Sequence, residues 1–180
     1  MRIVRARTTI EDLEEFLAEI RTVGEETGAT IQCFDARYVA GERHLRRATA
    51  LAERASEQGR AVADDPAVEM LLYAAGRRQI NRALEMGVST GDHEIVAVVT
   101  GGDEATAEER LTAEWDGPDG DGWDDTEASG DQTGDDETTT LGEPETLRAF
   151  FDIPAAELAI VDADLEAVVL ERVALLDVEK

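Results

Sequence analysis

Few residues in this sequence have the type and spacing that catalysis or metal binding requires. The histidines are His44 and His93, the single thiol is Cys33, and neither histidine falls within an HExxH motif or another zinc-ligand spacing. Cys33, His44 and Asp35 could form a nucleophilic triad on paper, but their closeness in sequence gives no geometric reason to expect one. We therefore predict that the protein is not an enzyme and that it holds no metal ion and no cofactor.

A glycine pair at residues 101–102 stands between an apolar, strand-like segment and an amphipathic segment. A strand, a glycine pair and a helix N-terminus can together hold a phosphate. However, the sequence GGDEAT has neither the lysine nor the spacing of a P-loop, and Asp103 and Glu104 would repel an anion. A plain helix-capping turn is therefore the expected structure.

Arginine and amide side chains form the clearest candidate for a binding site. Nine arginines face six acidic residues between Arg37 and Arg82, whereas residues 101–145 hold 17 acidic residues and one arginine. Because the guanidinium group matches phosphate geometry, a polyanion should bind the basic segment. Gln79 and Asn81 could then bond to the base edges of a single strand, and Tyr73 could stack on a base.

The same arginines have a simpler interpretation. In so acidic a chain, Arg77 and Arg78 could merely pair with neighbouring carboxylates such as Glu85. The sequence alone leaves both interpretations open.

Two short helices that meet at Gly76 should position these donors. Asp65 can cap the first helix, Pro66 suits its first turn, and its apolar residues place it in the core. The second helix is predicted over Arg77–Met86, with Gly87 as its stop. At 100° per residue its packing face holds Ile80, Ala83 and Leu84 and its exposed face holds Arg78, Asn81 and Arg82.

The remaining patterns predict an α/β fold of the mixed α+β type. Strands are expected at residues 2–7, 30–34 and 93–100, with Cys33 as a buried residue of the second and the third buried on both faces. The expected helices run from Thr8 or Thr9 to residue 23, and over residues 42–58, 104–115, 143–151, 154–159 and 162–176. A small central sheet of about three to four strands, packed with several helices in a single domain over residues 1–180, accounts for this pattern.

The last of these helices has apolar residues around more than half of its circumference. Such a helix cannot expose a broad side to water, so it either lies in the core or docks partly on another protein. The residues concerned include Leu165, Val168, Val169 and Leu176.

The overall charge is strongly negative, −25 for 180 residues, and 16 of the 17 cationic residues are arginine. An acidic surface almost without lysine is typical of a protein kept soluble in concentrated salt. A halophilic cytoplasm is therefore expected, with an acidic partner-binding face as the alternative. No segment has the composition of a membrane span or a secretion signal, so we expect a cytoplasmic protein without a membrane partner.

Residues 116–140 consist mainly of Gly, Asp, Glu, Ser and Thr and have no periodicity, which predicts a disordered acidic insertion. A calcium site is suggested by three closely spaced aspartates, Asp119, Asp121 and Asp125. The twelve-residue spacing of an EF-hand and its final glutamate are missing, so no calcium site is predicted.

Three segments resemble a known family. FDARYVAGERHLRRA (34–48), EMLLYAAGRRQINRALEMGV (69–88) and the tail FFDIPAAELAIVDADLEAVVLERVALLDV (150–178) are similar to the small kinase-binding subunit of the KEOPS complex, the CGI family that includes the animal TPRKB protein. The resemblance covers nearly the whole chain apart from the acidic insertion.

This resemblance implies a non-catalytic protein that binds the kinase-like ATPase subunit of KEOPS. In archaea that complex modifies tRNA with threonylcarbamoyl adenosine, and the small subunit recruits tRNA through its 3′ CCA end. DNA is not expected as a partner. The implied RNA-binding residues are Arg77, Arg78, Gln79 and Asn81, followed by His44 and Arg82. The implied kinase contacts are Leu165, Val168, Val169 and Leu176. The alternative is a stand-alone small-molecule enzyme or an anion-binding domain in a halophilic cytoplasm.

Overall fold

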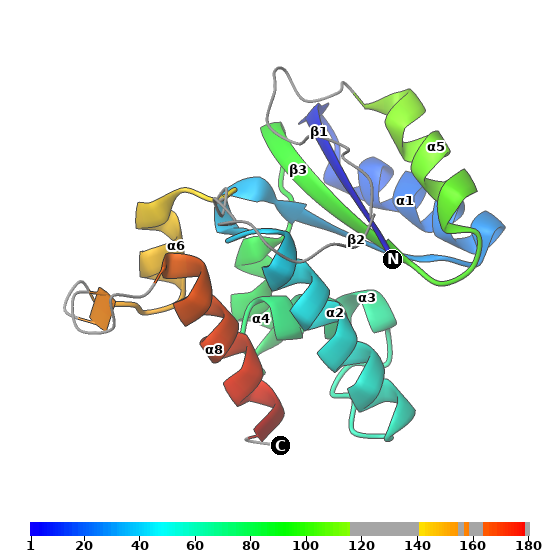
Figure 1. Cartoon of the computed structure of the whole chain (residues 1–180). Helices are drawn as coiled ribbons and strands as arrows, with labels where there is room; N and C mark the ends of the chain where they lie inside the picture. The colour runs from blue at the N-terminus through cyan, green and yellow to red at the C-terminus, as the bar shows by residue number, and fades with distance from the viewer. Residues whose placement is uncertain (116–140, 155–156, 159–163, 179–180) are drawn as a thin grey trace, which may run out of the picture.

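An antiparallel sheet separates the helices into two groups in the computed structural model of the chain, which describes residues 1–115, 141–154, 157–158 and 164–178 (Figure 1). Its strands are β1 (Arg2–Ile10), β2 (Thr30–Asp35) and β3 (Gly91–Thr100), in the order β1-β3-β2. The last strand in sequence thus lies in the middle and pairs antiparallel with both neighbours. A central position requires apolar residues on both faces, which explains the nearly unbroken apolar run of β3.

Alternation along β3 divides the core between the two faces of the sheet. Ile95, Ala97 and Val99 pack towards α1 (Leu13–Thr27) and α5 (Glu104–Glu114). Val96 and Val98 pack on the other face, where the helices are α2 (Glu42–Glu57), α3 (Pro66–Ala74), α6 (Pro144–Phe150) and α8 (Leu165–Val178). Figure 1 shows these two groups on opposite sides of the strands. Because the two clusters share one sheet, the mixed α+β single domain predicted from the sequence is confirmed.

The first helix begins later than predicted. Residues Thr8 to Ile10 continue β1, because Ile10 extends the alternation of buried side chains and is itself buried. The helix cap is therefore Asp12, whose carboxylate accepts hydrogen bonds from the backbone N–H groups of Glu14 and Glu15. The prediction of Thr8 or Thr9 as the cap is wrong.

The junction after α3 follows the sequence only in part. Asp65 caps α3 as predicted, accepting from the Ala67 N–H, and the helix ends before Gly76, which has φ +58°. The N–H groups of Gly76 and Arg77 bond back to the carbonyls of Tyr73 and Leu72 at 3.0 Å each. This pair of bonds is the Schellman motif that commonly ends a helix with glycine.

The continuous helix predicted over Arg77–Met86 is wrong. It is replaced by the four-residue α4 (Ile80–Ala83) and the 3₁₀ turn η2 (Leu84–Met86). Ala83 and Met86 are buried, whereas Ile80 and Leu84 are 43% and 54% exposed. So short a helix turns only a narrow side towards the core, and its other apolar residues stay at the surface.

The last helix provides core side chains, as one of the two interpretations of its sequence required. Val168, Val169 and Leu176 are buried against the α2 and α3 side of the domain. Before it, residues 141–143 run along the 3₁₀ turn η1 (Ala36–Tyr38). The predicted acidic insertion at 116–140 and half of the short helix predicted at 154–159 lie outside the described residues.

Within the part of the chain that the structure describes, no helix has the length and apolarity to cross a membrane. Cys33 is buried in β2 as predicted, and burial raises the pKa of its thiol to about 12.

Candidate functional site

The exposed donors cluster on the turn between α3 and η2. Arg78, Gln79 and Asn81 are exposed, and no hydrogen bond or ion pair joins their side chains to another described residue. Arg82 is also exposed but pairs at 3.2 Å with Glu85, the carboxylate that the pairing alternative named for Arg77 and Arg78. These predicted donors are thus exposed, although the helix that was to carry them is not formed, and their binding of RNA stays a prediction.

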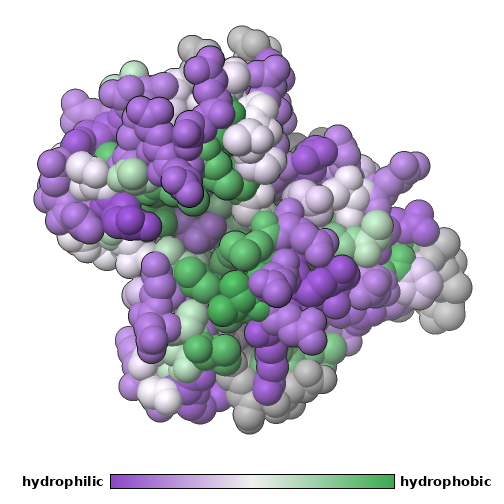
Figure 2. Space-filling view, turned by 180° about the vertical axis from the view of Figure 1, so that it is seen from behind, coloured by the Kyte–Doolittle hydropathy of each residue, from purple (hydrophilic) through white to green (hydrophobic). Residues whose placement is uncertain are grey.

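Two exposed apolar side chains lie within this group. Ile80 and Leu84 are four residues apart and so emerge on the same side of the α4 and η2 turns. Helix α4 lies behind α2 and α8 in Figure 1, and the view from behind in Figure 2 shows apolar surface gathered in the middle of that face and framed by hydrophilic side chains. Donors next to an apolar platform can hold a flat, polar-edged group such as an unstacked base.

Arg77 lies differently from the other donors. Its Nη2 group donates to the Phe150 carbonyl oxygen and, at 2.8 Å, to the carboxylate of Asp152, and its guanidinium carbon lies 5.7 Å from the centre of the Phe150 ring. Only 27% of the side chain is exposed. The carboxylate partner is thus Asp152, 75 residues away in sequence, and not the neighbouring Glu85.

His44 cannot contact RNA directly, because its side chain is fully buried. Its Nδ1 accepts a hydrogen bond from the Ala40 N–H at 3.2 Å and its Nε2–H donates to the Ala74 carbonyl at 2.8 Å. Burial lowers the pKa of His44 to about 4. The prediction that His44 binds RNA is therefore corrected to a structural role between α2 and α3.

Two further expectations at this junction also change. Tyr73 is fully buried and offers no stacking face. Gly76 is approached by the backbone of α8, since a Cβ atom there would lie 3.4 Å from the Arg172 carbonyl oxygen. Its positive φ and this neighbour explain the glycine without a bound ligand.

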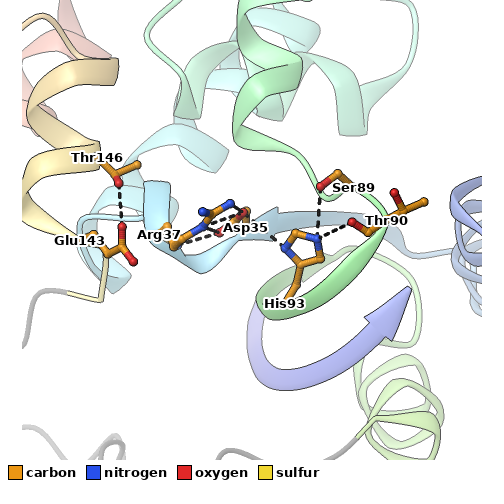
Figure 3. A network of polar contacts seen from close by, with 7 residues as sticks. All are labelled: Asp35, Arg37, Ser89, Thr90, His93, Glu143 and Thr146. Carbon is orange, nitrogen blue, oxygen red and sulfur yellow. Dashed lines mark hydrogen bonds and ion pairs between the residues drawn. The ribbon is translucent and has the colours of Figure 1, made fainter. Parts of the chain in front are cut away.

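The structure brings together one group that the sequence did not reveal (Figure 3). The Ser89 hydroxyl lies 3.2 Å from His93 Nε2, and His93 Nδ1 lies 3.5 Å from the carboxylate of Asp35. This is the order of a serine, histidine and aspartate relay. Asp35 and His93 come from strands β2 and β3, so only the pairing of those strands could have identified the group.

The charge around Asp35 argues against nucleophilic catalysis. Arg37 donates to this carboxylate from its backbone N–H at 3.0 Å, from Nε at 3.1 Å and from Nη2 at 2.6 Å. Arg37 thus compensates the negative charge of Asp35. A carboxylate compensated in this way, and 3.5 Å from the imidazole, stabilises an imidazolium ion poorly. The adjacent hollow is lined by His93 but not by Ser89. We assign this group a structural role, which is to fasten the start of β3 to the end of β2.

The predicted kinase contacts on α8 divide by burial. Val168, Val169 and Leu176 belong to the core, so they present no free surface, while Leu165 is partly buried. The opposite side of the same helix is also apolar, with Leu175 43% exposed and Leu170 and Ala174 partly exposed. At helical spacing these three residues lie within 140° of arc, an arc that they share with the exposed Glu171, so the outward strip of α8 is apolar apart from this one carboxylate.

The family comparison covers all of these elements. A family model described as kinase binding protein CGI-121 matches residues 8–177. No curated protein matches this chain.

Proposed function

This chain belongs to the family of the kinase binding protein CGI-121, and from that membership we propose that it is the small regulatory subunit of the KEOPS complex. In this role it binds the kinase-like ATPase subunit and recruits tRNA for threonylcarbamoyl adenosine modification. It contributes contacts and no chemistry of its own. The Asp35 carboxylate is paired with Arg37 and so does not support a catalytic relay, which agrees with a role in binding.

The proposed RNA site is the turn that carries Arg78, Gln79 and Asn81. The observation that supports it most directly is that these three donors are exposed and unpaired within the described residues, in a chain of net charge −25. Exposed arginine in such a chain favours a polyanion, and amide groups can bond to base edges.

The chemistry of this turn fits a single-stranded RNA end better than a duplex. Ile80 and Leu84 stand exposed beside the donors, and an apolar surface can pack only against bases that are not stacked in a helix. The 3′ CCA end of tRNA has three such bases. Arg78 would bind a phosphate, while Gln79 and Asn81 would bond to base edges.

The proposed kinase contact is the outward strip of α8. An apolar helix strip left at the surface is a common site for a partner protein. In this proposal Leu175 and Leu170 replace Val168, Val169 and Leu176, which are buried, and Leu165, which packs against the same core cluster. The RNA turn and this strip consist of different residues.

We test the RNA site by reversing one charge. Arg78→Glu should weaken binding of tRNA with an intact CCA end by roughly 10-fold or more, because one phosphate contact becomes a repulsion. Arg21→Glu, an exposed arginine of α1 on the opposite side of the sheet, is the matched control and should leave the affinity nearly unchanged. Binding is measured by fluorescence anisotropy over a series of potassium chloride concentrations.

A second RNA distinguishes the end from the body of the tRNA. A tRNA trimmed of its last three nucleotides should bind the wild-type chain weakly and should not distinguish Arg78→Glu from wild type. If the trimmed and intact tRNAs bind equally well, the CCA end is not the ligand.

A further inference from the structure

The backbone and the side chain of Arg77 bond to the ends of two different helices. The backbone of Arg77 closes the C-terminus of α3 through its bond to the Leu72 carbonyl. Its side chain reaches the C-terminus of α6, where it contacts the Phe150 carbonyl and the Asp152 carboxylate. One residue therefore joins the two helix ends, immediately before the exposed donors.

Asp152 occupies an unusual backbone position for an aspartate. Its φ is +53°, and it is the only residue other than glycine with a positive φ within the described ranges. The Ile153 N–H bonds back to the Arg148 carbonyl at 2.9 Å, which places Asp152 at the left-handed position after α6 where glycine is most frequent. Glycine would be less strained there, so the carboxylate that Arg77 binds is the feature that glycine could not supply.

The donors of the RNA turn depend on this anchor. Helix α4 has four residues and no side-chain cap at Gln79, and so short a helix is not stable by itself. Its orientation is fixed by the buried residues Ala83 and Met86 on one side and by Arg77 on the other. Arg78 and Gln79 lie between these two attachments.

We propose that Arg77 does not bind the RNA but positions the Arg78–Asn81 turn, through its contact with Asp152, for RNA binding. This inference rests on the proposed function and changes the role of one residue of the site. It also gives Asp152 a role, although an exposed carboxylate close to a polyanion site would otherwise only repel the ligand.

The two possible roles of Arg77 predict opposite effects of removing Asp152. If Arg77 contacts a phosphate, loss of the carboxylate frees the guanidinium and removes a repulsion, so RNA binding tightens. If Arg77 positions the turn, loss of the carboxylate releases the anchor, so RNA binding weakens. Asp152→Gly is the suitable variant, because glycine suits the positive φ and the fold should tolerate it.

The experiment measures tRNA affinity for Asp152→Gly, Arg77→Gln and Arg78→Gln against potassium chloride concentration. We expect Asp152→Gly and Arg77→Gln each to weaken binding by roughly 10-fold, with no further loss in the double variant because both act through one contact. The slope of log affinity against log salt should stay as in wild type for these two variants and fall by about one for Arg78→Gln, which loses a phosphate contact. Tighter binding by Asp152→Gly, or a reduced slope for Arg77→Gln, would overturn the proposal.

Amide hydrogen exchange of the free variants tests the anchor without RNA. Residues 78–83 should exchange faster in both Asp152→Gly and Arg77→Gln than in wild type and Arg78→Gln. Unchanged exchange refutes the positioning role even if affinity falls. If wild-type protein binds no tRNA at any salt concentration, the proposed function is wrong, and the exchange result alone then decides whether Arg77 holds the turn.

Discussion

At the scale of single residues, burial determines the role of His44. Both ring nitrogens are used by backbone groups, Nδ1 by the Ala40 N–H and Nε2–H by the Ala74 carbonyl. The Phe151 ring packs edge-on at 5.7 Å between centroids. These contacts require the neutral imidazole, because a second ring proton would face the Ala40 N–H. His44 thereby links the start of α2 to the end of α3.

This arrangement predicts a loss of stability on mild acidification. The pKa of His44 is about 4 in the folded chain, below its ordinary value of 6.5, so the unfolded chain binds the proton more readily. The stabilisation is complete above pH 6.5 and is lost as pH falls towards 4, by on the order of 3 kcal/mol. Urea unfolding between pH 7 and 4 measures it.

His44→Gln isolates the contribution of this histidine from that of the many carboxylates. Glutamine can both accept and donate a hydrogen bond but does not titrate. The variant should be less stable than wild type at pH 7, and the difference should shrink as pH falls. Parallel curves for the two proteins would show that another group causes the acid loss.

At the scale of elements, α8 has different tasks on its two sides. Val169 and Val173 are fully buried against the helices of the domain, whereas Leu175 is at the surface. A helix with apolar residues on both sides can pack in the core with one side and bind a partner protein with the other. The sequence pattern could not separate these two tasks, because both use the same residue types.

The kinase contact can be tested with two leucines of equal exposure. Leu175 on α8 and Leu17 on α1 are each 43% exposed. Leu175→Glu should weaken binding of the purified kinase subunit by roughly 10-fold or more, because it places a charge in an apolar contact. Leu17→Glu lies on the opposite face of the sheet and should bind as wild type does in isothermal titration calorimetry.

Val169→Ala separates the buried side of α8 from the outward side. Loss of two buried methyl groups should lower the free energy of unfolding by roughly 1–3 kcal/mol and leave kinase affinity of the folded protein unchanged. If Leu175→Glu binds normally while Val169→Ala does not, the proposed surface is wrong.

At the scale of the whole molecule, apolar side chains form the cores and charged side chains determine the response to salt. One central strand supplies apolar side chains to two cores, one on each face of the sheet. The chain as a whole has a net charge of −25. Like charges at this density repel one another strongly in dilute buffer, because the screening length is about 30 Å at 0.01 M salt. The repulsion is much weaker at 1 M salt, where the screening length is about 3 Å.

The fold should therefore be more stable in molar potassium chloride than in dilute buffer. Thermal unfolding followed by circular dichroism should show a midpoint that rises with salt concentration. An uncharged osmolyte at equal osmolality, which leaves the repulsion unscreened, should raise it less. Equal midpoints in dilute buffer and molar salt would remove the support for a halophilic cytoplasm.

The sequence by itself determined the features that short windows of residues control. The Asp65 cap, the glycine stop after α3 and the strands at Thr30 and before Thr100 depend on neighbours within a few positions, so they could be predicted. The basic segment and the absence of a zinc-ligand spacing were also visible, because both are properties of composition and spacing. The family resemblance rests on the same local segments.

Tertiary structure alone decided which side chains are available and which partners they meet. Arg77 finds Asp152 across 75 residues, and Asp35 meets His93 only because β2 and β3 pair. Ile80 faces water where the periodicity predicted packing. Helical periodicity predicts which residues share one face of a helix. Whether that face is buried depends on segments that are distant in sequence, so only the folded chain shows it.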